Sequence, residues 1–311
     1  MNSSAHLREI LEQSVAESRA LTSRGKLASY IPELARSNSG WVGAAVVDIN
    51  GNETCAGDCD VWFTMQSISK IISLMIALEI CGEDAVFSKV GKEPTGDPFN
   101  SIVRLETYRS RKPLNPLINA GAIAICSLIP GDTVAAREKR ILSFLRDVTL
   151  NPKTYVNGEV YESEKATGFR NHALAWFLKD LGVIEGSVDD CLDLYFRQCS
   201  MEITARDLAR IGAFLANDGV VPQTQKRLVQ PRTARIAKSL MSTCGLYDGS
   251  GEFGVEVGAP AKSGVGGGIV CAVPNRMGIG VFGPALDDRG NSVAGVKILE
   301  KLSRELHIAV L

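Results

Sequence analysis

A serine and a lysine three positions apart, Ser67 and Lys70, are the residues of this chain best suited to chemistry. An apolar stretch from 71 to 80 follows them and predicts a helix that begins near Ser67. Residues three apart share one face of a helix, so a lysine that burial keeps neutral could accept the proton of the serine hydroxyl. Acyl-transferring serine enzymes use the Ser-x-x-Lys arrangement in this way. A second copy, Ser23 to Lys26, is polar and turn-like, and we interpret it as coincidence.

The three histidines give little support to another way of activating the serine. His6 lies in a charged N-terminal segment and His307 lies near the C-terminus, so only His172 is placed where a site could use it. A packed or surface histidine is the commoner interpretation of such a position. We therefore expect Lys70 to be the base for Ser67.

Composition indicates a globular chain of enzyme size. The net charge is −1 over 311 residues, which gives no electrostatic basis for binding nucleic acid or an anionic membrane. Eight cysteines show no metal-binding spacing and are expected to be reduced, mostly buried thiols. The first 24 residues lack the apolar centre of a secretion signal, and the run 117–129 is too short to span a bilayer. We expect a cytoplasmic protein.

Strand patterns occur near both ends of the chain, with helical patterns between them. Apolar, β-prone runs predict strands at 41–47, 53–56, 253–257, 268–273 and 277–282. Helical periodicity predicts helices at 6–21, around Ile31 and Leu34, and at 135–148, 171–181, 188–199, 204–217 and 292–306. A hairpin followed by a late meander favours an antiparallel sheet. We expect a discontinuous sheet-plus-helix domain from 1–66 and 242–311, a mainly helical domain from 67–241, and the active site between them.

A second cluster of chemical interest is Lys262-Ser263-Gly264, which precedes Val265 and further glycines in strand-like sequence. It is similar to the Lys-Thr-Gly strand that lines the site of β-lactamase-type Ser-x-x-Lys enzymes. A lysine there adds positive charge beside the nucleophile, which would lower the pKa of Lys70. Glycines let backbone N–H groups approach a substrate, as an oxyanion hole requires.

Together these segments make the chain resemble the serine-dependent glutaminases, in their short, bacterial-type form. The matching segments, in family order, are Tyr30-Ile-Pro-Glu-Leu-Ala-Arg, Gln66-Ser67-Ile-Ser-Lys70, Asn115-Pro-Leu-Ile-Asn119-Ala-Gly-Ala-Ile, Glu164-Lys-Ala-Thr-Gly-Phe-Arg-Asn171, Tyr195-Phe-Arg-Gln-Cys-Ser, Cys244-Gly-Leu-Tyr247-Asp and Pro260-Ala-Lys-Ser-Gly-Val265. The resemblance implies an α/β (α+β) fold of the β-lactamase/transpeptidase type, with a mainly antiparallel sheet flanked by helices and an all-helical domain. Thr167 and Phe169 depart from residues common in the family, and neither replaces a proposed contact.

The resemblance also implies roles for individual residues. Ser67 would be the nucleophile and Lys70 its base, backbone groups of Ser67 and Val265 would form the oxyanion hole, and Lys262 would support them. Tyr195 and Tyr247 would be catalytic by passing a proton to departing ammonia. The residues implied to bind substrate are Tyr30, Ser67, Asn119, Glu164, Asn171, Tyr195, Tyr247 and Val265. The implied reaction converts L-glutamine to L-glutamate and ammonia without a cofactor or metal, in a homo-oligomer that is a dimer or a tetramer.

Two other functions remain open at this point. A penicillin-recognising serine hydrolase shares Ser-x-x-Lys and Lys-[Ser/Thr]-Gly but normally works outside the cytoplasm. A non-catalytic amino-acid-binding module could keep the pocket as a sensor, although intact Ser67, Lys70 and Lys262 argue against a decayed site.

Overall fold

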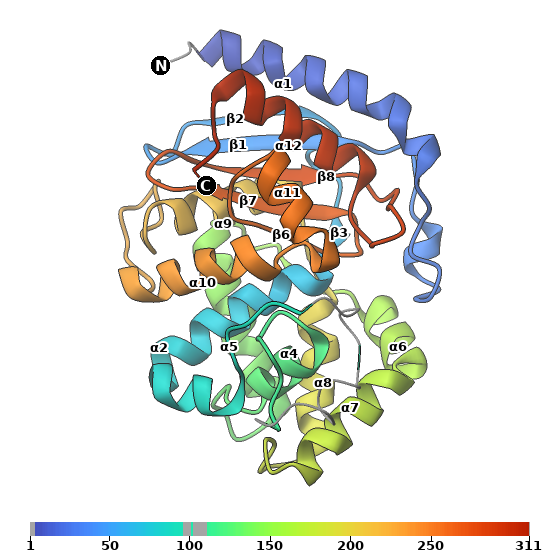
Figure 1. The fold of residues 1–311 in the computed structure, drawn as a ribbon, viewed down its shortest axis with the longest axis vertical. Helices are drawn as coiled ribbons and strands as arrows, with labels where there is room; N and C mark the ends of the chain where they lie inside the picture. Colours follow the sequence, from blue (N-terminus) through green and yellow to red (C-terminus); the bar gives the residue numbers. More distant parts are fainter. Residues whose placement is uncertain (1–3, 96–100, 102–110, 311) are drawn as a thin grey trace.

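An antiparallel sheet drawn from two distant parts of the chain forms the upper half of the molecule (Figure 1). The structure is a computed structural model that describes residues 4–95, 101 and 111–310. Its strands lie in the order β2-β1-β8-β7-β6, and each neighbouring pair is antiparallel. Their bounds are β1 Gly43–Asp48, β2 Glu53–Gly57, β6 Ala261–Ser263, β7 Gly268–Val273 and β8 Met277–Phe282.

Helices cover both faces of this sheet. Helices α1 (Ser4–Arg19) and α12 (Val293–Leu306) pack on one face, and α9 (Ala205–Ala216) packs on the other (Figure 1). Ala44 and Val46 of β1 face the α12 side, whereas Ala45 and Val47 face α9. Because both faces are buried, β1 is a continuous apolar run and lacks the alternation of a strand with one wet face.

Glycines allow α9 to approach the sheet closely. A Cβ added at Gly278 would lie 1.9 Å from the backbone nitrogen of Ala213, and one added at Gly280 would lie 2.2 Å from the carbonyl oxygen of Ala205. Neither backbone atom can move aside as a flexible side chain could. The two glycines of β8 therefore determine how near α9 lies.

Replacing Gly278 with alanine is expected to lower the free energy of unfolding by about 3 kcal/mol, because the methyl group overpacks the contact between helix and strand. Urea unfolding followed by circular dichroism measures this change. Gly251→Ala is the matched control, since nothing lies within 4 Å of its added Cβ. Equal stability of the two variants would show that the contact between α9 and β8 relaxes freely.

The lower half of the molecule is mainly helical (Figure 1). Its helices are α2 Ser69–Lys89, α4 Asn119–Cys126, α5 Val134–Thr149, α6 Gly158–Thr167, α7 Phe169–Asp180, α8 Val188–Cys199 and α10 Pro231–Cys244. A small antiparallel sheet of order β3-β5-β4 contains Phe63–Thr64, Met201–Ile203 and Tyr155–Val156. One large cluster of buried apolar side chains joins these helices.

The predicted antiparallel sheet flanked by helices is confirmed, whereas the strand predicted at 253–257 is wrong. That segment belongs to helix α11 (Ser250–Glu256) and its C-terminal end. Phe253 and Val257 are buried while Val255 is 83% exposed. A strand would place all three on one face, but a helix separates Val255 from the other two.

Two further differences are smaller. The helical stretch expected around Ile31 and Leu34 is a short 3₁₀ turn, Leu34–Arg36, and the small three-stranded sheet has no counterpart in the sequence analysis. The division at 66/67 and 241/242 stays a prediction, although α9, from the middle of the chain, packs on the large sheet. Among the described helices, none has the length and apolarity needed to cross a bilayer.

Candidate active site

Ser67 lies in a tight turn between β3 and α2. The turn is the 3₁₀ segment Gln66–Ile68, and the buried Lys70 follows in the first turn of α2. Gln66 has a φ of +50°, in the left-handed region that side chains rarely adopt. Ser69 Oγ donates a hydrogen bond to the Gln66 carbonyl at 2.7 Å, which holds this turn. The residue directly before the predicted nucleophile thus has an unfavourable backbone conformation.

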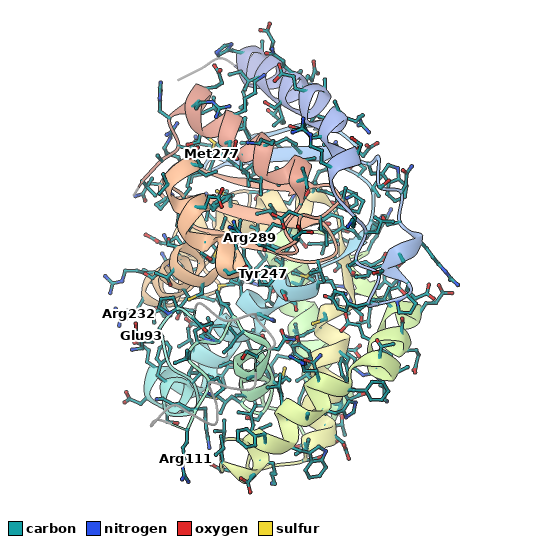
Figure 2. All side chains as sticks on the ribbon, turned by 45° about the vertical axis from the view of Figure 1, so that its right-hand side comes forward. Glu93, Arg111, Arg232, Tyr247, Met277 and Arg289 are labelled. Carbon is teal, nitrogen blue, oxygen red and sulfur yellow. The ribbon has the colours of Figure 1, made fainter. Side chains whose placement is uncertain are left out.

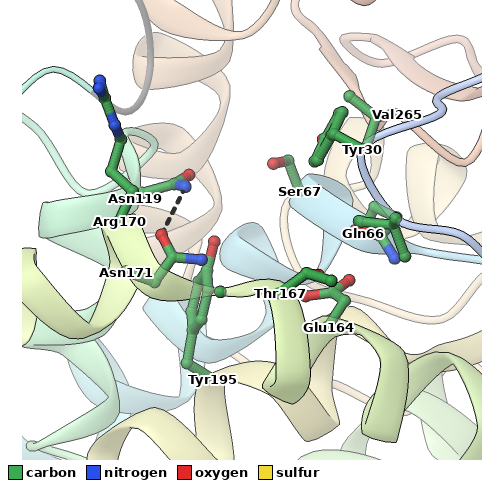
Figure 3. A pocket seen from close by; sticks show the side chains of 12 residues that line it. Tyr30, Gln66, Ser67, Asn119, Glu164, Thr167, Arg170, Asn171, Tyr195 and Val265 are labelled. Atoms are coloured by element: carbon green, nitrogen blue, oxygen red, sulfur yellow. Dashed lines mark hydrogen bonds between the residues drawn. The ribbon is translucent and has the colours of Figure 1, made fainter.

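Lys70 is fixed by α4 and by the segment before it. Its Nζ donates to Asn119 Oδ1 at 2.7 Å and to the Leu117 carbonyl at 3.1 Å. Asn119 Nδ2 in turn donates to Asn171 Oδ1 at 2.9 Å, a bond drawn in Figure 3. Burial lowers the pKa of Lys70 to about 8, so about a tenth of the amine is neutral at pH 7 and about half at pH 8.

The turn between β6 and β7 lies against the backbone before Ser67. An added Cβ would lie 2.5 Å from the Met65 carbonyl oxygen at Gly264 and 2.3 Å from the Thr64 carbonyl oxygen at Gly266. Only glycines permit this approach, which brings Val265 next to Ser67 at the same cavity. Within the described residues, neither the Ser67 N–H nor the Val265 N–H donates a hydrogen bond. Two unused backbone donors at a nucleophile are what an oxyanion hole requires.

A cavity of about 110 Å³ opens beside Ser67. Seven of the eight residues predicted to bind substrate line it: Tyr30, Ser67, Asn119, Glu164, Asn171, Tyr195 and Val265 (Figure 3). They come from segments far apart in the chain, including the 3₁₀ turn before α2, the helices α4, α6, α7 and α8, and the β6–β7 turn. The eighth residue, Tyr247, is not among the lining residues, but it lies close enough to Ser67 for the Ser67 hydroxyl to lower its pKa.

Glu164 gives the cavity a buried carboxylate. The residue is 6% exposed, and within the described part of the chain its Oε1 has no hydrogen-bond partner. Burial raises its pKa to about 7, against the opposing effects of a hydrogen bond from Gln66 and the charge of Lys70. A buried carboxylate oxygen without a partner is costly unless a ligand cation supplies one.

The two tyrosines predicted to be catalytic are both protonated at neutral pH. Burial raises the pKa of Tyr195 well above its usual value. Burial also raises the pKa of Tyr247 to about 12, and the hydroxyl groups of Ser67 and Ser263 act in the opposite direction. Tyr247 lies where the sheet-bearing half meets the helical half (Figure 2), and its φ is +56°. A protonated phenol beside Ser67 is placed to donate a proton there.

Lys262 is fully buried beside this tyrosine. Its Nζ donates to the Ser263 carbonyl at 2.6 Å and lies 4.5 Å from the centre of the Tyr247 ring. Burial lowers the pKa of Lys262 well below its usual value, and the charge of Lys70 lowers it further. Because the repulsion between the two positive charges is mutual, it disfavours the state in which both lysines are protonated. Burial is the main cause that lowers the pKa of Lys70.

The sequence analysis missed Gln66 and Ser263 as parts of the site. Gln66 lines the cavity and lowers the pKa of Glu164, and Ser263 lies beside Tyr247 and lowers its pKa. Gln66 is next to Ser67 and Ser263 is next to Lys262, so their positions beside predicted site residues could have indicated them. Among the described residues, no three His, Cys, Asp or Glu side chains gather as metal ligands would.

The fold is of the β-lactamase-like class, and Ser67 of its Ser-x-x-Lys motif lies at the cavity. Comparison with known proteins narrows this class to one family. The model of the Glutaminase family matches residues 25–311. Glutaminase 2 of Clostridium perfringens is 55% identical over 304 residues, covering 98% of this chain and 100% of that protein.

Two crystal structures of a probable glutaminase from Bacillus subtilis are also similar. One has a TM-score of 0.92 at 38% identity and covers 98% of this chain and 97% of that one. The other, complexed with 6-diazo-5-oxo-L-norleucine, has a TM-score of 0.89 at 37% identity, with coverage of 97% and 95%. The chain belongs to the glutaminase family.

Proposed function

We propose that the protein hydrolyses L-glutamine to L-glutamate and ammonia through an acyl-enzyme on Ser67. The observation that carries the proposal is a single cavity lined by both Ser67 and Glu164. Ser67 is close to the buried Lys70, and within the described residues Glu164 Oε1 has no hydrogen-bond partner. Family membership supports the same reaction, since the curated relatives are named glutaminases.

Neutral Lys70 takes the proton of Ser67, and the serine oxygen attacks the carbon of the side-chain amide. The N–H groups of Ser67 and Val265 hold the negative oxygen that develops. The C–N bond then breaks, and ammonia leaves with a proton from a protonated tyrosine, a role for which Tyr247, beside Ser67, is suited. Water attacks the resulting ester, which releases L-glutamate and restores Ser67.

Substrate recognition follows from the charges at the cavity. The carboxylate of Glu164 pairs with the α-ammonium group, and the neutral Tyr30, Asn119 and Asn171 offer donors for the α-carboxylate. Tyr195 packs beside them. The ligand of the Bacillus structure is an L-amino acid with a carbonyl at its fifth carbon, the position that the glutamine amide occupies. The chain length of this ligand supports a pocket whose length matches that of glutamine.

Glutamine should be hydrolysed at least about a hundredfold more efficiently than asparagine, as judged by kcat/KM. Asparagine is one methylene shorter, so fixing its α-groups leaves its amide short of Ser67. A coupled ammonia assay with glutamine and asparagine, run beside hydrolysis of a chromogenic β-lactam, is the test. Similar kcat/KM values for glutamine and asparagine would show that the substrate pocket has been assigned wrongly. Turnover of the β-lactam alone would favour a penicillin-recognising hydrolase. Glutamine binding without turnover would favour an amino-acid-binding module.

Replacing Lys262 with methionine is expected to move the midpoint of the rising limb of kcat/KM against pH to higher pH. The positive charges of the two buried lysines repel each other, so the substitution removes a like charge that disfavours protonated Lys70. The pH profile of the variant measures this midpoint, whatever the change in rate. A downward or absent shift would show that Lys262 does not tune Lys70 and that burial lowers the pKa of Lys70 without it.

Location and assembly complete the proposal. We infer a cytoplasmic protein because its eight cysteines are free thiols, which suits a reducing compartment, and a homo-oligomer, dimer or tetramer, from the family resemblance. Size-exclusion chromatography with light scattering tests the second.

A further inference from the structure

Two cysteines lie together between β2 and α9, outside the cavity of the proposed function. Cys55 belongs to β2, and Cys59 lies two residues beyond the end of that strand. Cys55 packs against the cluster of buried side chains to which Cys59 belongs, and its thiol raises the pKa of Cys59. Among the other described cysteines, Cys81 donates to the Leu128 carbonyl and Cys126 donates to Gln198 Oε1.

Arg206 of α9 holds the segment that carries both sulfur atoms. Its Nη1 lies 2.6 Å from Glu53 Oε1, and its Nε lies 2.6 Å from Asp60 Oδ1. These carboxylates flank the pair, because one precedes Cys55 by two residues and the other directly follows Cys59. The ion pairs fix the two ends of the segment to one side chain, so the cysteines stay close without a covalent bond.

The two thiols differ in access to solvent. Cys55 is half-buried, whereas Cys59 is 4% exposed and donates to Asp60 Oδ2 at 3.6 Å. Burial raises the pKa of Cys59 to about 12, and the charge of Arg206 opposes that rise. Cys55 can therefore meet a reagent from solution first, and Cys59 can reach only its neighbour.

We propose that Cys55 and Cys59 are a modification site, a dithiol that a low-molecular-weight disulfide oxidises to an intramolecular disulfide. The Cys55 thiolate attacks the reagent, forms a mixed disulfide and releases one thiolate. Cys59 then gives up its proton, attacks the Cys55 sulfur and expels the second thiolate. Two electrons pass to the reagent, which leaves as two thiols, and the protein loses two hydrogen atoms. In a reducing compartment such a bond is transient and reports oxidising conditions.

Mass spectrometry of the whole, native protein tests the proposal without using its activity. The protein is treated with oxidised glutathione, its remaining thiols are alkylated, and it is digested with trypsin. Residues 37–70 form one tryptic peptide that contains these two cysteines and no other. The expected result is loss of two hydrogens from this peptide, reversed by dithiothreitol. A peptide that stays fully alkylated, or that carries glutathione on both cysteines, would overturn the proposal.

Single variants identify the order of attack. Cys59→Ser is expected to stop at a stable mixed disulfide on Cys55, and Cys55→Ser is expected to leave Cys59 unmodified. Cys81→Ser, at another half-buried cysteine, is the matched control and should form the disulfide as the unsubstituted protein does. Mixed disulfide on Cys59 in the Cys55→Ser variant would contradict the assigned order. The wild-type measurement decides the proposal even if a variant fails to fold.

Discussion

Replacing Ser67 with alanine is expected to lower kcat for ammonia release from L-glutamine by about 10⁴-fold or more. The hydroxyl oxygen forms the acyl bond, and no neighbouring group can take its place: Tyr247 is protonated, and the described thiols nearest the site are buried. The remaining cavity is unchanged, so glutamine binding should survive. A coupled ammonia assay measures the loss, and isothermal titration measures binding.

Ser73→Ala is the matched control for this substitution. Ser73 lies on α2 one turn beyond Lys70, and its hydroxyl bonds only to the backbone carbonyls of Ser69 and Lys70 in the described chain. Its removal should change kcat by less than about threefold, in keeping with loss of one local hydrogen bond. Turnover by the Ser67→Ala protein close to that of the control would exclude the acyl-enzyme.

Replacing Lys70 with methionine is expected to lower kcat/KM by about 10³-fold or more and to abolish part of its pH dependence. In the unsubstituted protein the base form of Lys70 appears as pH rises through about 8, so activity should rise there and be lost as pH falls. Glu164, with a pKa of about 7, ionises over an overlapping range and favours substrate binding in its charged form. Methionine is of similar length and carries no proton, so only the Glu164 limb should remain.

The pH profiles of both proteins between about pH 6 and 9 separate these contributions. Residual activity of Lys70→Met that still rises through pH 8 would assign the limb to another group. Asn119→Ala tests the positioning of Lys70, since Asn119 Oδ1 accepts its hydrogen bond. Loss of that acceptor should lower kcat while leaving the limb in place.

The sequence alone determined the order and type of most elements near the site. The helices predicted at 135–148, 188–199 and 292–306 are found with nearly the same bounds, because their apolar residues recur at helical spacing. The meander at 268–273 and 277–282 was also predicted, since β-branched runs interrupted by turn residues are local signals. The family match then supports the fold and the reaction class, because the family's motifs are short runs of neighbouring residues that can be recognised in the sequence.

Only the tertiary structure determined which segments pack together and which side chains are buried. Phe253 and Val257 suit a strand or a helix in isolation, and packing against α12 and the sheet selects the helix. The pKa of Lys70 depends on burial by α4, and the contrast between Lys262 and Lys70 depends on their surroundings, which no spacing in the sequence records. Glu164 is an ordinary charge until folding buries it beside Gln66. Desolvation and close approach arise from segments distant in sequence, so they exist only once the chain has folded.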